Sequence, residues 1–249
     1  MSYVDLHCHL LPGLDDGAAT MEATVAHARR LSAAGVRDVA CTPHIKRRDF
    51  PRLDLSALAG LRAAAQAAIA AAGLDVRLHG GGELGHDDAL LLAPQAFELI
   101  AQGPDDARWL LLECPFEGIE DDFTEAADRL WELGYDLLLA HPERAAPVAG
   151  ADGRLLALVD RGALLQVNAT SLLGRHGPRA RAVAERLLGD GLVWCLASDG
   201  HPGTRDDTLD RGFEALVRGG ASERLVALLT QDNPRLLLSE GAAPLSLAA

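Results

Sequence analysis

His7 and His9 lie at the end of an apolar run near the start of the chain, and two histidines at this spacing could bind one metal ion together. In a β-strand, residues two apart face the same side, so the two imidazoles are expected to point toward one spot. Imidazole is a common ligand of divalent transition metals. The pair therefore predicts part of a metal site at the carboxyl end of a first strand.

Six later apolar runs also end in side chains that bind metals or phosphate. In chain order these side chains are His44, Glu83, Glu113, His141, Asn168, and Asp199 together with His201. Asp16 adds a carboxylate in the loop after the first run. A single His or Glu would mean little, because such a residue is usually solvated or satisfied in the core. Their recurrence at nearly every strand end predicts a metal centre.

The candidate ligands are too many for one ion. They are His7, His9, Asp16, His44, Glu83, Glu113, His141, Asp199 and His201. One catalytic zinc ion takes three or four protein ligands, so two or three divalent ions fit this set better. Imidazole and carboxylate without thiolate suit Mn²⁺, Fe²⁺ or Zn²⁺. Three divalent ions exceed the four carboxylates by about two positive charges, which matches a phosphate dianion.

Two arginines follow the last histidines of this set. Arg144 comes three residues after His141, and Arg205 comes four residues after His201. A guanidinium group binds two phosphate oxygens at once, so both arginines are candidates for a phosphate clamp. A centre with several metal ions can also generate hydroxide near neutral pH for in-line attack on phosphorus.

Alternating strands and helices must position these residues. The expected strands are 3–10, 39–44, 76–83, 109–113, 136–141, 163–168 and 193–199. Helical spacing of apolar residues predicts helices over 21–34, 55–72, 89–101, 124–133, 153–161 and 180–188, and a last helical segment to Pro234. Apolar strands that alternate with helices indicate an α/β fold with parallel pairing. Polar residues at all the strand ends favour a closed barrel over an open sheet.

Composition limits the class of protein. The chain of 249 residues can bury one core, so we expect one domain over residues 1–249. The net charge of −13 argues against nucleic-acid binding, which needs a basic face. No apolar stretch is long enough to span a bilayer, and there is no signal peptide. The four scattered cysteines are typical of reduced thiols, so we expect a cytoplasmic protein.

The motifs resemble those of a known superfamily. Asp5-Leu-His-Cys-His9 with the following Leu-Leu-Pro-Gly-Leu-Asp-Asp-Gly, then Thr42-Pro-His44, Gly82-Glu83, His141-Pro-Glu-Arg144 and Ser198-Asp-Gly-His201, carry this resemblance. They are similar to the PHP (polymerase and histidinol phosphatase) superfamily. The Leu-Pro-Gly-Leu-Asp-Asp-Gly and His-Pro-Glu-Arg segments resemble its CpsB/CapC branch, the manganese-dependent protein-tyrosine phosphatases of bacterial capsule and exopolysaccharide systems.

This resemblance implies a distorted (β/α)7 barrel of the PHP type with a trinuclear metal site at the carboxyl ends of the strands. It implies that the nine candidate ligands bind Mn²⁺ and that Arg144, and with it Arg205, binds phosphate. His201 or water would protonate the leaving oxygen. The implied substrate is phosphotyrosine on the C-terminal tail of a bacterial tyrosine kinase that controls polysaccharide export. The oligomeric state is left open.

Other functions compete with this hypothesis. A histidinol-phosphate phosphatase of the same superfamily would share every ligand, and residues 84–88 contain no aromatic side chain that would favour a phenyl ester. A non-catalytic metal-binding module is less favoured because the ligand set is complete. An amidohydrolase with a carboxylated lysine is excluded, because Glu113 stands at the fourth strand end and Lys46 is the only lysine.

A thiol phosphatase is the last alternative, because Cys41 and Arg47 have Cys-x5-Arg spacing. The intervening loop lacks glycine and Pro43 lacks an N–H group, so it is a poor phosphate cradle. We therefore expect Cys41 in the core. The remaining histidines, His27, His79, His86 and His176, are interpreted as surface or packing residues. The basic run from Lys46 to Arg48 could dock an acidic phosphopeptide or remain solvated.

Overall fold

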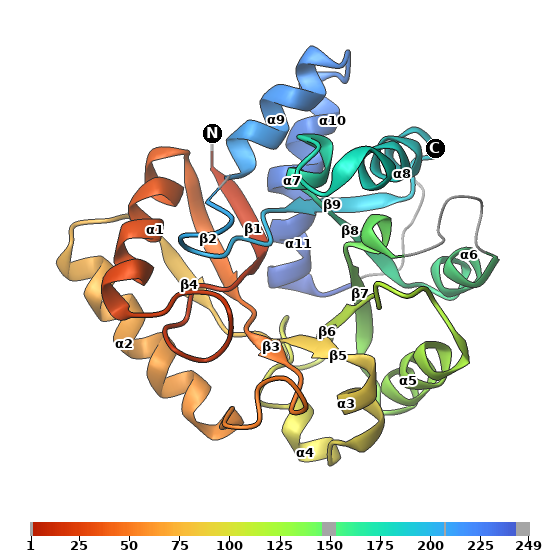
Figure 1. Ribbon diagram of the computed structural model, residues 1–249, viewed down its shortest axis with the longest axis horizontal. Helices are drawn as coiled ribbons and strands as arrows, with labels where there is room; N and C mark the ends of the chain where they lie inside the picture. Colours follow the sequence, from red (N-terminus) through yellow and green to blue (C-terminus); the bar gives the residue numbers. More distant parts are fainter. Residues whose placement is uncertain (1, 146–152, 207, 243–249) are drawn as a thin grey trace.

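The computed structural model describes residues 2–145, 153–206 and 208–242 (Figure 1). Its strands are β1 (Tyr3–Cys8), β2 (Val36–Cys41), β3 (His44–Ile45), β4 (Arg77–His79), β5 (Glu83–Gly85), β6 (Trp109–Glu113), β7 (Asp136–Ala140), β8 (Leu164–Asn168) and β9 (Val193–Ala197). All strand pairs are parallel. The predicted α/β fold with parallel strands is thus confirmed.

Most helices lie around the outside of the strands, whereas α11 lies in the middle of this view (Figure 1). They are α1 (Met21–Ala33), α2 (Leu58–Ala71), α3 (His86–Leu91), α4 (Pro94–Phe97), α5 (Asp121–Glu132), α6 (Gly153–Asp160), α7 (Ala169–Leu172), α8 (Gly177–Gly189), α9 (Leu209–Arg218), α10 (Glu223–Ala227) and α11 (Asn233–Glu240). Short 3-10 turns are η1 (Leu55–Ala57) and η2 (Pro142–Arg144), and η3 (Leu228–Asp232) is a π-helix. Thr20 caps α1 by accepting a hydrogen bond from Ala23 N at 3.3 Å. None of the described helices is long and apolar enough to cross a membrane.

One predicted helix is wrong. The range 89–101 is divided into α3 and α4, and residues 98–101 are not helical. Ala93, between the two helices, has an extended backbone with φ −67° and ψ 147°. The cause is Pro94, because a proline disfavours the helical conformation of the residue before it. The apolar periodicity alone did not reveal this interruption.

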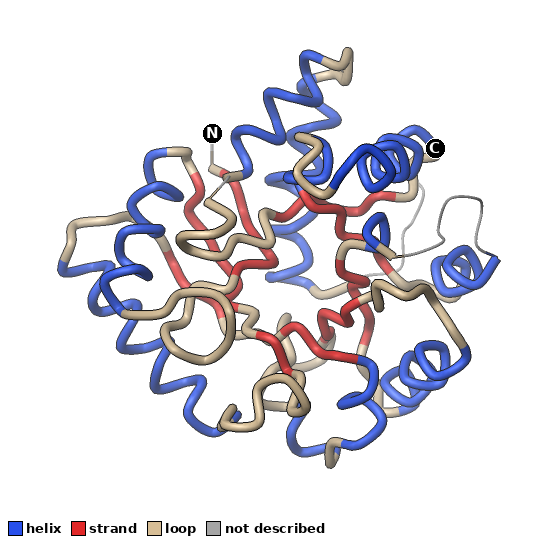
Figure 2. The backbone as a smooth tube through the Cα atoms, viewed as in Figure 1, coloured by secondary structure: helices blue, strands red, loops and turns tan. Residues whose placement is uncertain are grey.

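The seven expected strand positions form a ring around a common centre (Figure 2). Two of the positions are interrupted: β2 continues into β3 after Thr42 and Pro43, and β4 continues into β5 after three glycines. The hydrogen-bonded sheets are therefore β1-β2-β4 and β3-β5-β6-β7-β8-β9. Asp199 N donates to His7 O and His9 N donates to Gly200 O, both at 2.9 Å, and these bonds join the last strand to the first. The ring is thus a distorted barrel whose seams carry few ladder bonds.

A β-bulge in β1, between Asp5 and Cys8, changes which side chains face the inside of the ring. The register advances by three residues in β1, from Asp5 to Cys8, against two in β2. Val4 and Leu6 pack in an apolar cluster with residues of β6–β9 and α11, whereas Cys8 packs in the other cluster, with residues of the surrounding helices. Bulges re-aim side chains in this way. His7 and His9 consequently lie on the face that Val4 and Leu6 occupy earlier in the strand.

The opposite end of the ring is closed by α11. Leu237 of this helix belongs to the inner cluster, and its carbonyl accepts a hydrogen bond from Trp109 Nε1 at 3.0 Å. Trp109 is the first residue of β6, so α11 lies at the amino ends of the strands. The carboxyl ends, with the predicted ligands, remain open to a cavity.

Candidate metal centre

The structure brings all nine predicted ligands together at the carboxyl ends of the strands. They form four overlapping groups whose ligand atoms lie within 4.8 Å of one another: His7, His9 and Asp199; His7, Glu83 and His141; His44, Glu83 and Glu113; and His9, Asp16, His44 and His201. Overlap of this kind is expected where several ions share ligands. The residues could therefore hold more than one divalent cation.

The spacing of the donor atoms supports a cation site. Nε2 of His7 lies 3.2 Å from Nε2 of His9, and both nitrogens lie 3.4–3.5 Å from Oδ1 of Asp199. Metal–ligand bonds of about 2.1 Å place neighbouring ligand atoms roughly 3.0–3.4 Å apart. At most one proton can lie between two facing imidazole nitrogens, so a shared cation explains this arrangement better than hydrogen bonds among the donors.

Glu83 is the centre of the cluster. Its Oε1 lies 3.3 Å from His7 Nε2 and 2.8 Å from His141 Nε2. Its Oε2 lies 3.4 Å from His9 Nε2 and 2.8 Å from His44 Nδ1. A carboxylate with different neighbours at its two oxygens is suited to bridging two cations. Glu113 approaches from the next strand, with Oε2 4.0 Å from His44 Nδ1.

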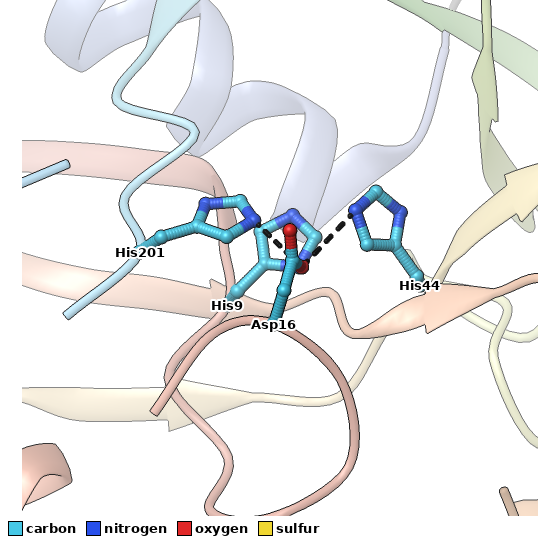
Figure 3. Close-up of side chains that lie close together, drawn as sticks. All are labelled: His9, Asp16, His44 and His201. Atoms are coloured by element: carbon cyan, nitrogen blue, oxygen red, sulfur yellow. Dashed lines mark hydrogen bonds and ion pairs between the residues drawn. The ribbon is translucent and has the colours of Figure 1, made fainter. Parts of the chain in front are cut away.

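Asp16 faces two histidines from the loop after β1 (Figure 3). Its Oδ1 lies 3.1 Å from His201 Nε2 and 3.4 Å from His44 Nε2. The side chain of Asp16 is 59% exposed, unlike the buried imidazole of His9 beside it. Asp16 therefore forms the outer edge of the group and can meet both a cation and solvent.

Asp15 is a residue of the site that the sequence analysis missed. Its Oδ2 accepts hydrogen bonds from His9 Nδ1 at 2.7 Å and from His44 N at 2.9 Å, and its Oδ1 accepts one from Gly17 N at 2.9 Å. The loop is tight, because a Cβ atom at position 17 would lie 2.3 Å from His9 O. The Asp-Asp-Gly sequence signals an acidic turn, but only the fold distinguishes the two carboxylates.

Hydrogen bonds fix three histidines with Nε2 toward the cluster. Nδ1 of His7 bonds to Oε1 of Gln166 at 3.0 Å, and Nδ1 of His201 bonds to the carbonyl of Asp199 at 2.9 Å. Asp15 does the same for His9. Amide, carbonyl and carboxylate oxygens only accept, so each Nδ1 donates in these bonds, and the neutral form of each imidazole then has its lone pair on Nε2. Such partners orient metal-binding histidines.

A chain of buried amides connects two of these groups. Gln166 Nε2 donates to Asn168 Oδ1 at 2.8 Å, and Asn168 Nδ2 donates to Asp199 Oδ2 at 2.8 Å. Because Gln166 also accepts from His7, the orientation of His7 is coupled to that of Asp199. Asn168 thus supports a candidate ligand, and so does Gln166, which was not among the residues predicted from sequence.

Backbone strain occurs at two of the candidate ligands. Among the described residues other than glycine, only His141 (φ 38°) and Asp199 (φ 50°) have a positive φ. This conformation is uncommon for side chains larger than glycine and usually persists where the surrounding fold enforces it. Each residue follows a strand directly or after one residue. The strain turns the two side chains into the ring.

Both predicted arginines contact the same carboxylate oxygen. Arg144 Nη1 and Arg205 Nη1 lie 2.8 Å and 3.0 Å from Oδ2 of Asp199. The other oxygen, Oδ1, faces His7 and His9. The two guanidinium groups thus border the cluster at one point, where a phosphate clamp would lie. Nη2 of Arg205 also lies 2.6 Å from Nδ1 and 2.7 Å from Nε2 of His201.

Lys46 also reaches the cluster. Its ammonium group forms an ion pair with Oε2 of Glu113. Arg47, the next residue of the basic run, pairs with Asp88 at 2.7 Å. The run is therefore neither a free docking patch nor fully solvated, because its first two residues are held by carboxylates of the fold.

Burial and neighbouring charges set the protonation of the cluster. Although burial raises the pKa of Glu83, the charges of His7 and His44 hold it well below the usual range. Burial lowers the pKa of His141 to about 4. Near neutral pH Glu83 is thus ionised and His141 is neutral, the forms that bind metal ions.

A cavity of about 580 Å³ adjoins the cluster. Metal-type donors, cations and two phenyl rings line it together: Asp16, His44, Glu113, His141, Asp199 and His201, with Lys46, Arg144 and Arg205, and with Phe50 and Phe116. Neither ring comes from residues 84–88, the segment expected to carry an aromatic side chain if the substrate is a phenyl ester. They come from the loops after β3 and β6.

Cys41 lies in the core, and burial raises the pKa of its thiol to about 12. His27 is fully buried in α1, and His79 pairs with Asp38 at 2.8 Å. His86 lies near Asp122 at 3.3 Å, and His176 bonds to Ser171 at 2.9 Å. None of these residues is among the nine candidate ligands.

Cys41→Ser is expected to leave phosphatase activity within about twofold of the wild type. A thiol whose pKa is near 12 is protonated at pH 7–8 and is a poor nucleophile. Iodoacetamide treatment of the wild type at pH 7.5 is likewise expected to leave turnover unchanged. Complete loss of activity in a folded Cys41→Ser protein, judged by its thermal melting curve, would restore the thiol mechanism.

Comparison with known proteins identifies the family. The family of capsular polysaccharide synthesis proteins CpsB/CapC matches residues 3–239, and the chain belongs to this family. Tyrosine-protein phosphatase YwqE of Bacillus subtilis (strain 168) is 30% identical over 241 residues, which cover 94% of this chain and 91% of YwqE. Putative tyrosine-protein phosphatase CapC of Staphylococcus aureus is 28% identical over 204 residues, covering 80% and 76%.

Solved structures agree with this assignment. The structure described as YwqE from Bacillus subtilis and CpsB from Streptococcus pneumoniae, unique metal-dependent tyrosine phosphatases, has a TM-score of 0.79, 26% identity and coverage of 96% and 94%. The phosphotriesterase homology protein from Escherichia coli, complexed with phosphate, has a TM-score of 0.59, 15% identity and coverage of 93% and 97%, which indicates a shared fold only. Membership of the CpsB/CapC family, which the motifs predicted, is confirmed.

Proposed function

We propose that this protein is a metal-dependent phosphoric monoester hydrolase that removes phosphate from phosphotyrosine. The observation that carries the proposal is the convergence of nine donor side chains, six of which line one cavity, with two arginines beside them. The family relationship supports it, since YwqE and CapC are named tyrosine phosphatases.

The nine residues are proposed as ligands of two or three divalent ions, with Mn²⁺ preferred over Fe²⁺ and Zn²⁺. The donors are nitrogen and oxygen atoms, and the described cysteines are buried away from them, which suits this choice. Such ions polarise phosphoryl oxygens and lower the pKa of water toward neutrality. Glu83 is shared between two groups, as are His7, His9 and His44, and these shared residues hold the ligand set together.

The chain's own residues then bind and orient the ester. Arg144 and Arg205 bind the phosphoryl oxygens and stabilise the charge that develops on them. The proton for the leaving oxygen comes from water or from His201, which lines the cavity and can act as the acid only while its Nε2 holds a proton instead of a metal ion. A phenolate leaves readily, so the contribution of His201 is smaller for phosphotyrosine than for an alkyl ester.

Gln166→Leu is expected to lower the affinity for Mn²⁺ by about 10–100-fold, because His7 loses the acceptor that fixes its Nδ1 proton. Titration calorimetry of the metal-stripped protein measures this affinity. Gln102→Leu is the matched control, since the Gln102 side chain is buried but has no hydrogen-bond partner. Equal affinities of Gln166→Leu and the wild type would contradict the orienting role.

The physiological substrate is proposed to be the phosphorylated C-terminal tail of a bacterial tyrosine kinase that controls capsule or exopolysaccharide synthesis. The name of the family, capsular polysaccharide synthesis, supports this assignment. A cytoplasmic location is proposed with it, since the four cysteines are unpaired thiols. No nucleic-acid partner is proposed, in line with the net charge of −13.

Histidinol phosphate is the competing substrate, because the same metal ligands would serve it. The test is a side-by-side assay of the Mn²⁺-loaded protein on a phosphotyrosine peptide and on histidinol phosphate, with and without chelator. We expect preference for the peptide and loss of turnover with chelator. Preference for histidinol phosphate would keep the metal centre but reject the tyrosine-phosphatase proposal, and activity that survives complete metal removal would reject both.

A further inference from the structure

Phe116 is an unusually placed apolar residue. It follows β6 by three residues, lines the 580 Å³ cavity of the candidate metal centre and is 45% exposed. A scattered exposed hydrophobic side chain needs no explanation, but one in the wall of a polar cavity does. Its position suggests a contact with the part of the substrate that is not phosphate.

The ring of Phe116 is held by charged and aromatic neighbours. The guanidinium of Arg144 lies 4.6 Å from the ring centroid, and the ammonium of Lys46 lies 6.0 Å from it. The imidazole of His141 is stacked at 6.0 Å with an interplanar angle of 27°. Phe116 thus touches the proposed phosphate clamp and a proposed metal ligand, while nearly half of its surface remains open.

Phe50, the other phenyl ring of the cavity, is less available. It stacks on His44 with centroids 5.5 Å apart and an interplanar angle of 6°, and its residue is only partly exposed. One face of Phe50 is thereby committed to a proposed metal ligand. Phe116 is consequently the ring with more surface free for a bound molecule.

Phe116 also lies where three cavities meet. A cavity of about 510 Å³ with Lys46, Arg48 and His86 and another of about 300 Å³ with Arg144, His176 and Arg179 both include Phe116 in their walls. A substrate that extends from the metal centre into either neighbouring cavity therefore passes the ring. This arrangement suits a side chain that projects from a longer polypeptide.

We propose that Phe116 determines specificity for aryl phosphates by stacking on the ring of the leaving group. This inference rests on the proposed phosphatase function and adds the residue that selects the ester. Phosphate held by the arginines places its ester group beside Phe116, because Arg144 contacts both. An aromatic pair contributes about 0.5–1.5 kcal/mol beyond area burial, which corresponds to roughly 2–12-fold in affinity.

The test compares two unreactive ligands, benzylphosphonate and methylphosphonate, by titration calorimetry with the Mn²⁺-loaded protein. Phe116→Ala and Phe116→Leu are expected to weaken benzylphosphonate roughly 2–12-fold while methylphosphonate binds as in the wild type. Phe116→Tyr retains a ring and is expected to preserve the difference. Leu91→Ala, which removes another exposed apolar side chain outside the cavity, is the control and is expected to change neither affinity.

Equal weakening of both phosphonates would overturn the proposal, because Phe116 would then only position Arg144. Unchanged affinity for both would overturn it as well. Metal content and melting temperature are measured for each variant, and Phe116→Leu provides the comparison if the alanine variant does not fold. Since binding is measured without turnover, failure of the wild type to hydrolyse phosphotyrosine would reject the proposed function independently of this result.

Discussion

Glu83→Ala is expected to lose bound metal and phosphatase activity together, with activity reduced by at least about 100-fold. Both oxygens of Glu83 face imidazoles, with His7 and His141 on one side and His9 and His44 on the other. Its removal therefore disturbs more than one ion site at once. The substitution also removes the negative charge beside the four histidines, which favours the binding of cations there.

Metal content per chain, measured by elemental analysis after dialysis, and turnover of a phosphotyrosine peptide check this expectation. Glu185→Ala is the control, because Glu185 lies on the surface of α8, where it pairs with Arg181 at 2.8 Å. The metal hypothesis would be wrong if a metal-free Glu83→Ala protein turned over substrate at the rate of the wild type.

Arg144→Ala is expected to keep its metal and lose turnover by about 10²–10³-fold, the usual effect of removing one donor that stabilises developing charge. The side chain contacts Asp199 Oδ2 but none of the histidines by hydrogen bond, so the ligand set stays in place. Arg144→Lys restores the charge but not the planar fork, and only partial recovery is expected.

Steady-state kinetics and metal analysis of the same preparations separate these effects. Arg205→Ala is predicted to lose turnover as Arg144→Ala does, since the two side chains meet at the same oxygen of Asp199. Its metal content is expected to change more, because Nη2 of Arg205 also contacts the imidazole of His201. Arg181→Ala on the surface of α8 is the control. Unchanged kcat/KM in Arg144→Ala would show that the clamp has been assigned to the wrong residue.

The sequence analysis compared the charge of three divalent ions with that of four carboxylates, and the structure adds two further charged residues to this comparison. Asp15 adds a buried carboxylate, and Lys46 adds an ammonium group at Glu113. These two charges cancel, so three divalent ions would still leave about two positive charges for a phosphate dianion. Both added charges lie against the cluster, because Asp15 contacts His9 and Lys46 contacts Glu113.

Sequence alone was sufficient to predict the parallel α/β fold and the convergence of the nine donors. Apolar runs that end in His, Glu or Asp specify strands with polar carboxyl ends, and parallel strands bring those ends to one edge. Period-2 spacing correctly placed His7 and His9 on a common face. It did not indicate which face, because the bulge between Asp5 and Cys8 reverses the alternation.

Tertiary structure decided the residues that support and surround the centre. Gln166 bonds to His7 across 159 residues of sequence, and Lys46, which follows β3, pairs with Glu113 of β6. Contacts of this kind depend on strand order and register, which local periodicity does not encode. The position of Phe116 in the cavity wall could likewise not be predicted from sequence, because the fold of the loop after β6 places its ring beside Arg144. The local sequence determines which residues are candidate ligands. The ring of strands determines which residues hydrogen-bond to those ligands and which side chains line the cavity beside them.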